Sequence, residues 1–87
     1  MPYFVYVLRS KEGLRYTGQT PDIERRLYEH NSGASHSTKH GNDWKVIHLE
    51  EYATRAEAMK REKYLKSGAG REWLKTIIEG VESAAAE

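Results

Sequence analysis

The sequence contains no cysteine. Disulfide bonds and thiolate metal sites are therefore excluded, and this composition fits a reducing compartment such as the cytoplasm. Long apolar segments are also missing. The longest run, YFVYVL at residues 3–8, is too short to cross a bilayer, and no basic segment precedes it as a signal peptide requires. We therefore expect a cytoplasmic protein with no membrane partner.

A strong net charge is missing as well, because 14 Lys and Arg residues nearly balance 13 Asp and Glu residues. The distribution is uneven, however. Residues 54–75 carry seven basic and three acidic side chains, and the residues after them carry only acids. Such a basic segment is either a surface that faces an anion or a solvated helix face, and charge alone leaves both open. With 87 residues, the chain has room for one small domain.

The first third of the chain predicts a β-hairpin followed by a helix. YFVYVLR at 3–9 and LRYTGQ at 14–19 are rich in β-branched and aromatic residues, and SKEG between them is typical of a turn. Thr20 is then expected to cap a helix with Pro21 in its first position. Residues 31–33 should end this helix, with Asn31 capping it.

The rest of the chain predicts one strand and two helices. WKVIHLEEY at 44–52 favours a strand, and the pair Thr54 and Glu57 is the capping box of a helix that ends at 67–68. A last helix is expected at 70–78, and Trp44 and Trp73 in the core. We therefore predict an α+β fold of order β-β-α-β-α-α, with a three-stranded antiparallel sheet flanked by helices. Residues 1–79 would form the domain and residues 80–87 a flexible tail.

Several polar side chains are expected to face the interior. Strand alternation and a hairpin loop with an odd number of residues would place Tyr6 and Tyr16 on one sheet face. Arg26 and His30 lie one helical turn apart beside the apolar stripe of their helix. All four could therefore point toward one space.

Glu62 is the fifth such residue, since it falls beside Ala58, Met59 and Leu65 on the apolar side of its helix. A buried carboxylate is costly unless a positive group meets it. Each residue also has an ordinary structural explanation: a cross-strand tyrosine pair, an Arg26–Asp22 ion pair, a helix-dipole contact of His30, or a Glu62–Lys66 pair.

Four short segments share one family pattern. FVY at 4–6 and YTG at 16–18 occupy the places of two tripeptide motifs, RRLYEHN at 25–31 is similar to an Arg-x-x-x-His helix, and AMKREKYLKSG at 58–68 is similar to a segment with a metal-binding glutamate. On these motifs the chain resembles the GIY-YIG nuclease superfamily, in particular its short stand-alone bacterial branch, over roughly residues 3–78. Phe4, Val5 and Thr17 depart from the motif residues and change packing.

The resemblance implies a metal-dependent endonuclease that hydrolyses nucleic-acid phosphodiester bonds, DNA more than RNA, in repair or processing. It assigns catalysis to Tyr6, Tyr16, Arg26, His30 and Glu62. Tyr6 would be the base or water-orienting group, and Arg26 would grip the phosphate. Tyr16 and His30 would hydrogen-bond the phosphate or the water. Glu62 would bind one Mg²⁺ or Mn²⁺, weakly in the absence of substrate.

Further basic residues are candidate contacts to the nucleic-acid backbone. They are His36, Lys39, Lys60, Arg61, Lys63 and Lys66. A zinc site made of His30, His36 and His40 is disfavoured, because the spacing is irregular and no thiolate is present. Two alternatives to an enzyme remain: a nucleic-acid-binding module of the same fold without efficient cleavage, and a small domain that binds a protein partner.

Overall fold

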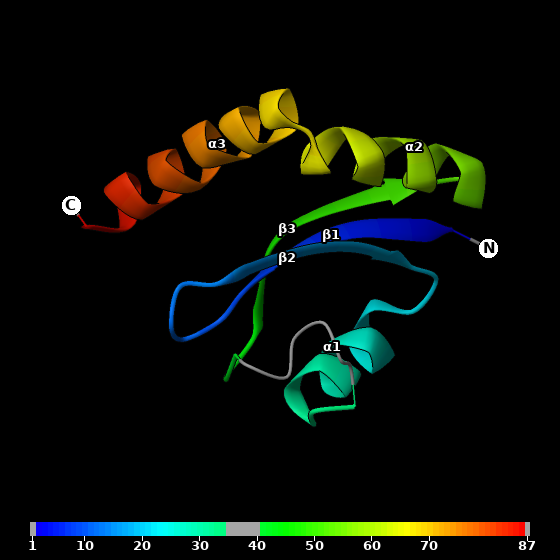
Figure 1. The fold of residues 1–87 in the computed structure, drawn as a ribbon, viewed down its shortest axis with the longest axis horizontal. Helices are drawn as coiled ribbons and strands as arrows, with labels where there is room; N and C mark the ends of the chain where they lie inside the picture. Colours follow the sequence, from blue (N-terminus) through cyan, green and yellow to red (C-terminus); the bar gives the residue numbers. More distant parts are fainter. Residues whose placement is uncertain (1, 35–40, 87) are drawn as a thin grey trace.

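The fold is a three-stranded sheet between helices (Figure 1). The computed structural model describes residues 2–34 and 41–86, with side chains as far as Ile78. Strands β1 (Tyr3–Arg9), β2 (Arg15–Thr20) and β3 (Lys45–Tyr52) are antiparallel in the order β2-β1-β3. The helices are α1 (Ile23–Asn31), α2 (Arg55–Lys66) and α3 (Gly68–Ala86). The predicted α+β class and the order β-β-α-β-α-α are confirmed.

The hairpin fixes which side chains share a sheet face. Gly13 has φ +91°, a conformation that favours glycine, and it lies in the loop of residues 10–14. Tyr6 pairs with Gly18, and Leu8 pairs with Tyr16. The loop therefore has an odd number of residues, and Tyr6 and Tyr16 lie on the same face, as predicted.

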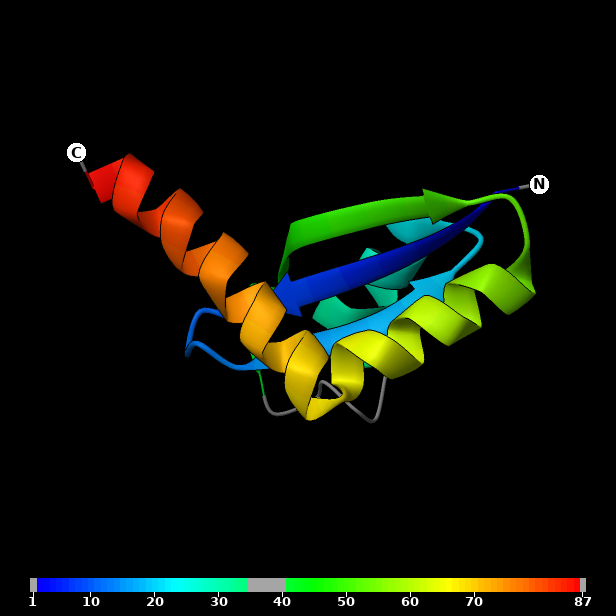
Figure 2. The same cartoon turned by 90° about the horizontal axis from the view of Figure 1, so that it is seen from above.

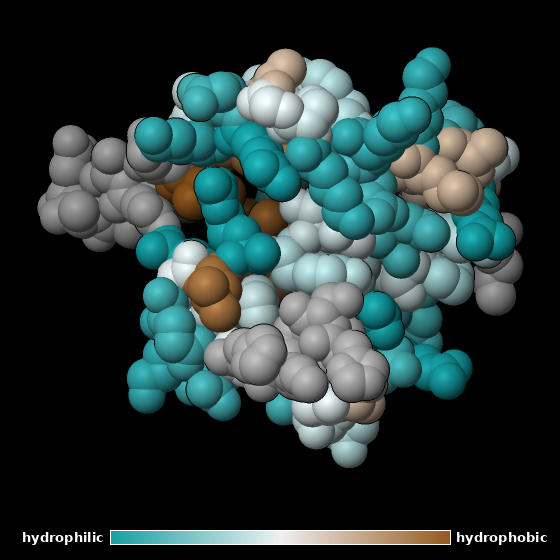
Figure 3. Space-filling model, viewed as in Figure 1, coloured by the Kyte–Doolittle hydropathy of each residue, from teal (hydrophilic) through white to brown (hydrophobic). Residues whose placement is uncertain are grey.

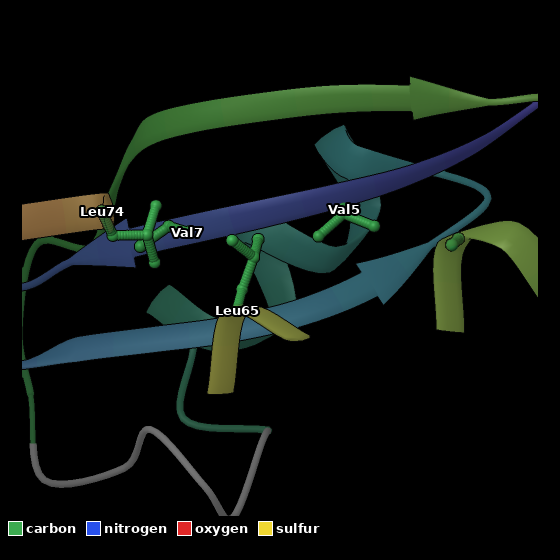
Figure 4. Packing of buried hydrophobic residues seen from close by; sticks show 5 residues of the cluster. Val5, Val7, Leu65 and Leu74 are labelled. Atoms are coloured by element: carbon green, nitrogen blue, oxygen red, sulfur yellow. The ribbon is translucent and has the colours of Figure 1, made fainter. Parts of the chain in front are cut away.

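The central strand β1 is buried on both faces, because Val5, Tyr6, Val7 and Leu8 are each at most 1% exposed. Val5 and Val7 pack against α2 and α3, where they meet Leu65 and Leu74 (Figure 4). Tyr6 and Leu8 point the other way, and their cluster contains Trp44 and the apolar side of α1. The two clusters hold α1 on one face of the sheet, and α2 with α3 on the other.

Helix α1 begins later than predicted. Asp22 is its N-cap, and the carboxylate accepts a hydrogen bond from the Arg25 N–H at 3.1 Å. Thr20 belongs to β2, where it pairs with Phe4, and its hydroxyl accepts from the Asp22 N–H at 3.1 Å. The predictions of Thr20 as the cap and of Pro21 as the first helical residue were therefore wrong.

Helix α2 begins as predicted, since the Thr54 hydroxyl accepts from the Glu57 N–H and donates to the Glu57 carboxylate. Two side chains near it, Met59 and Trp73, were predicted to be buried, and both predictions were wrong. Met59 is 50% exposed, because α2 buries the side marked by Ala58 and Leu65 instead. Trp73 is 36% exposed at the core edge, whereas Trp44 is buried as expected.

Helix α3 starts at Gly68 and continues to Ala86, well past the predicted end at Ile78. Alanine-rich sequence at residues 84–86 favours this continuation. The helix diverges from the sheet along its length (Figure 2). The division into a domain of residues 1–79 and a flexible tail of residues 80–87 stays a prediction. Among the described helices, none is long and apolar enough to cross a membrane.

Candidate active site

Tyr6, Arg26 and His30 form a hydrogen-bonded chain between β1 and α1. The Tyr6 hydroxyl lies 3.0 Å from His30 Nε2 and accepts a hydrogen bond from Arg26 Nε at 3.3 Å. Tyr6 and His30 are each 1% exposed. The one-turn spacing of Arg26 and His30 turns both toward the sheet, because residues four apart share a helix side. The structure therefore brings these three predicted catalytic side chains together.

Tyr16 joins this group from β2. Its ring centroid lies 4.8 Å from that of His30 and 6.1 Å from that of Tyr6. Gly18 makes the arrangement possible, because a Cβ at this position would lie 2.6 Å from the Tyr6 hydroxyl and 2.9 Å from the Tyr16 ring. The sequence placed Gly18 in the YTG tripeptide but indicated no role for it. Its requirement comes from the contact between two strands, which no local signal reveals.

Burial sets the protonation states of Tyr6 and His30. It raises the pKa of Tyr6 to about 12, although the hydrogen bond from Arg26 opposes the rise. Burial and the charge of Arg26 lower the pKa of His30 to about 4. Both groups are therefore neutral at pH 7. Because Arg26 can only donate, the Tyr6 hydroxyl keeps its own proton and can donate it to His30 Nε2 in the tautomer that carries the imidazole proton on Nδ1.

The Arg26 guanidinium remains accessible for a ligand. Burial alone would lower its pKa, but the phenols of Tyr6 and Tyr16 hold that pKa above its ordinary value. The Arg26 side chain is 31% exposed and lies 3.7 Å from the Glu29 carboxylate. The Asp22 pairing that the helix spacing allowed is absent from the described ion pairs, since Asp22 caps the helix. Tyr6 thus holds Nε of Arg26 in place, while the other N–H groups of this partly exposed guanidinium can bind a ligand.

Glu62 approaches from the other face of the sheet, where α2 runs along the edge strand β2 (Figure 2). It lines a groove of about 630 Å³ together with Gln19 of β2. Lys66 Nζ lies 2.7 Å from the Glu62 carboxylate, so the predicted alternative of an i,i+4 pair is present. After burial and the nearer groups, the charge of Glu62 also helps to raise the pKa of Tyr6. Glu62 and Tyr6 therefore interact electrostatically around the β2 edge.

Metal binding within the described residues would rely on one carboxylate. No group of three His, Asp or Glu side chains suited to a metal occurs in residues 2–34 and 41–78. The half-buried Glu62 suits Mg²⁺ or Mn²⁺, which keep several waters and take remaining oxygens from a substrate phosphate. It does not suit zinc, which requires three or four protein ligands. The donor set fits an ion held jointly by protein and substrate.

The structure separates the basic residues of α2 into two groups. Lys63 and Lys66 line the groove of Glu62. Lys60 and Arg61 line a different pocket, beside Tyr52 of the far edge strand β3. The proposed backbone contacts of α2 therefore do not form a single row.

Arg61 is also occupied by protein partners. Its guanidinium donates two hydrogen bonds to the Glu50 carboxylate, at 2.9 and 3.1 Å, and lies 4.7 Å from the Trp73 ring centroid. The same carboxylate accepts from the Tyr52 hydroxyl at 2.6 Å. Sequence spacing could not reveal this network, because Glu50 and Arg61 meet across the sheet–helix interface. His36 and Lys39 lie outside the described residues.

Asn31 has a role that the sequence did not suggest. Its side chain accepts from the Trp44 N–H at 2.7 Å and donates to the Trp44 carbonyl at 3.1 Å. Ser32 is the C-cap of α1, so the prediction of Asn31 as the cap was wrong. The paired bonds tie the end of α1 to the start of β3, which keeps His30 seated against the sheet.

Comparison with known proteins identifies the class to which this fold and site belong. The model of the GIY-YIG catalytic domain matches residues 2–75, and the chain belongs to the GIY-YIG family. A UPF0213 protein of Staphylococcus saprophyticus is 35% identical over 79 residues, which cover 90% of this chain and 96% of the relative. A UPF0213 protein of Listeria welshimeri is 43% identical over 65 residues, covering 74% and 72% of the two chains.

Two solution NMR structures are similar to this chain. The UPF0213 protein BH0048 of Bacillus halodurans has a TM-score of 0.55 at 31% identity, over 88% of this chain and 85% of that one. The protein EF2693 of E. faecalis has a TM-score of 0.56 at 37% identity, over 88% and 86%. The names of these relatives state no activity, so they support the family and the fold alone.

Proposed function

We propose that this protein is a metal-dependent endonuclease that hydrolyses phosphodiester bonds in nucleic acid, DNA more than RNA, in cytoplasmic repair or processing. The observation that carries the proposal is the hydrogen-bonded chain from the partly exposed Arg26 through the buried Tyr6 to the buried His30, with Tyr16 beside it. An ordinary cross-strand tyrosine pair needs neither a hydrogen bond from a guanidinium nor a buried imidazole beside it. Membership of the GIY-YIG catalytic family supports the same conclusion.

The protonation states of Tyr6 and His30 suggest how these two side chains act in catalysis. Forming a free Tyr6 phenolate at pH 7, with a pKa of about 12, would cost about 7 kcal/mol. Tyr6 therefore works as a relay: it takes a proton from the attacking water while it passes its own proton to neutral His30. A neutral imidazole with a low pKa holds that proton only transiently, so His30 readily returns it to Tyr6.

The cationic side of the site stabilises the phosphate. The donors of Arg26 other than Nε grip two phosphate oxygens and meet the charge that grows in the transition state. Tyr16 holds the phosphate or the water from the β2 side. Glu62 would hold one Mg²⁺ or Mn²⁺, which when bound supplies Lewis-acid stabilisation of the phosphate. Lys66 must first leave the Glu62 carboxylate, so metal and substrate are expected to bind together.

One observation favours a binding module as the second candidate. In the free protein Lys66 already neutralises Glu62, and Tyr6 remains protonated. A domain that only grips nucleic acid would tolerate both features. It would also use the same cations without needing the proton relay.

A cleavage assay separates these functions. Single-stranded, duplex, flap and branched DNA, with a single-stranded RNA, are incubated with the protein with and without Mg²⁺ or Mn²⁺. Tyr6→Phe and Glu62→Ala test the relay and the metal ligand. Tyr28→Phe, at a position 73% exposed, and Glu72→Ala on the exposed side of α3 are matched controls.

We expect metal-dependent cleavage that falls about 10²–10⁴-fold in Tyr6→Phe. Glu62→Ala should lose the response to metal, and both controls should cleave as the wild type does. Salt-sensitive binding without cleavage would support the binding module. Absence of any binding to nucleic acid would contradict both and favour a protein partner. Melting temperatures measured in parallel identify a variant that has lost its fold.

A further inference from the structure

A second groove adjoins the candidate active site on the α2–α3 side of the sheet. It has a volume of about 440 Å³ and is bounded by β2, the end of α2 and the start of α3. Val7, Leu65 and Leu74 contribute its apolar lining. Figure 3 shows a hollow with hydrophobic atoms at its floor and hydrophilic side chains around the rim, where α2 and α3 meet above β2.

The charged lining of this groove is wholly basic. Arg15 of β2, Lys66 of α2 and Arg71 of α3 line it, and among the described residues no Asp or Glu does. Arg15 and Arg71 are exposed, and the ion pairs among the described residues include neither of them. Three segments distant in sequence thus each place a basic side chain at this groove, and Arg15 and Arg71 have no acidic partner there.

The groove is continuous with the site of Glu62. Tyr16 lines the groove and also packs on His30. Lys66 lines the groove and forms the ion pair with Glu62. An extended polyanion whose phosphate lies beside Tyr16 and Glu62 therefore meets Arg15 and Arg71 next. Strand alternation explains the geometry, because Arg15 and Tyr16 are neighbours on opposite faces of the edge strand β2.

Two other basic regions of the described chain lack this combination. The pocket of about 550 Å³ beside Trp44 contains Arg9, Lys11 and Lys45, but also Asp43, and none of the candidate catalytic residues lines it. On the β3 side, Glu50 already neutralises Arg61. The groove of Arg15 and Arg71 is thus the better extension of the site.

We infer that Arg15 and Arg71 bind the phosphate backbone of the nucleic-acid strand next to the cleaved bond. This inference rests on the proposed function, since it assigns the path of the same substrate. Arg15 lies on the far sheet face from Tyr6, so it acts in binding the strand rather than in the chemistry. Thr17, half-buried on the same side of β2, adds a hydroxyl that can donate to a phosphate oxygen.

The test is the salt dependence of binding. Fluorescence anisotropy with a labelled single-stranded and a labelled duplex oligonucleotide, in EDTA to prevent cleavage, gives Kd at several KCl concentrations. The variants are Arg15→Gln, Arg71→Gln and the double variant. Arg55→Gln, an exposed arginine at the opposite end of α2, is the matched control. All three substituted positions are exposed, and unchanged melting temperatures in the four variants establish that the fold persists.

Each lost phosphate contact should reduce the slope of log K against log salt by about 0.7 on a single strand or about 0.9 on a duplex. We expect that loss in each single variant, about twice the loss in the double variant, and no change in Arg55→Gln. A slope equal to that of the wild type in the double variant overturns the inference, as does a wild type that binds neither oligonucleotide. Occupancy of the groove by an acidic protein would give the first of these results.

The two proposals can fail separately. Reduced slopes together with no cleavage of any substrate would leave the backbone path standing and overturn the nuclease. Metal-dependent cleavage that Tyr6→Phe abolishes, together with unchanged slopes, would leave the nuclease standing and overturn the path through Arg15 and Arg71.

Discussion

Replacing Gly18 by alanine tests whether the phenol of Tyr6 is held where the proposed chemistry needs it. The new Cβ would lie 2.6 Å from the Tyr6 hydroxyl oxygen, 2.8 Å from Tyr6 Cζ and 2.9 Å from Tyr16 Cε1. Real Cβ atoms do not approach other atoms so closely. Tyr6 cannot easily retreat, because it is 1% exposed and its hydroxyl is bonded to Arg26 and His30.

The expected loss of stability comes from two opposing effects. Forcing an extra methyl group into a packed site costs about 1–3 kcal/mol. Removing a glycine restricts the unfolded chain and offsets about 0.4–1 kcal/mol of that cost. The middle of these two ranges leaves a net loss of about 1–2 kcal/mol in the free energy of unfolding. For a domain of this size, the melting temperature should fall by roughly 5–15 °C.

Thermal unfolding followed by circular dichroism measures this change. Gly68→Ala is the matched control, since a Cβ there has no neighbour within 4 Å and the residue opens α3. Its melting temperature should stay constant or rise slightly. Tyr6→Phe removes the hydroxyl oxygen that makes the shortest contact with the new Cβ. The loss of stability in the double variant Gly18→Ala/Tyr6→Phe should therefore differ from the sum of the two single losses by at least about 0.5 kcal/mol. A Gly18→Ala protein as stable as the wild type would refute the close packing of the site.

Three further predictions follow from the polar networks. Although burial would raise it, hydrogen bonds from Arg61 and its neighbours lower the pKa of Glu50 to about 2, below its ordinary 4.5. Glu50 therefore stabilises the fold above pH 4.5, and this contribution is lost as pH falls toward 2. Glu50→Gln should cost about 2–3 kcal/mol in urea unfolding at pH 7 and much less at pH 2.5, and an equal cost at both would contradict the network. Burial and Arg26 lower the pKa of His30 to about 4. The fold thus loses stability as pH falls from about 6.5 to 4, and NMR should place the His30 midpoint near 4, against 6.5 for an exposed ring. Thr54→Ala should lower the free energy of unfolding by about 1 kcal/mol in a denaturant titration, because it removes the acceptor for the Glu57 N–H.

Local signals were sufficient where one segment decides its own structure. Strand propensity and turn residues predicted the hairpin, and Thr54 with Glu57 predicted the start of α2. These features depend on residues within a few positions of one another, so a single sequence contains them.

Features that depend on contacts between distant segments were not predictable in the same way. Met59 falls near an apolar stripe by helical spacing, yet α2 turns a different side to the sheet. The partner of Arg61 is Glu50 on β3, and the partner of Asn31 is the backbone at Trp44. Choosing among these partners requires the crossing geometry of helices and sheet, which no periodicity in one segment specifies.

Strand β1 contributes side chains to two buried clusters, one on each face of the sheet. Its odd-numbered residues Val5 and Val7 belong to the aliphatic cluster under α2 and α3, and its even-numbered residues Tyr6 and Leu8 belong to the cluster under α1. Inserting or deleting one residue within this strand would exchange the two sets, placing a phenol among aliphatic side chains and a valine beside the imidazole of His30. A change in the number of residues in β1 would therefore disturb the fold and the candidate site together, because both depend on a single register.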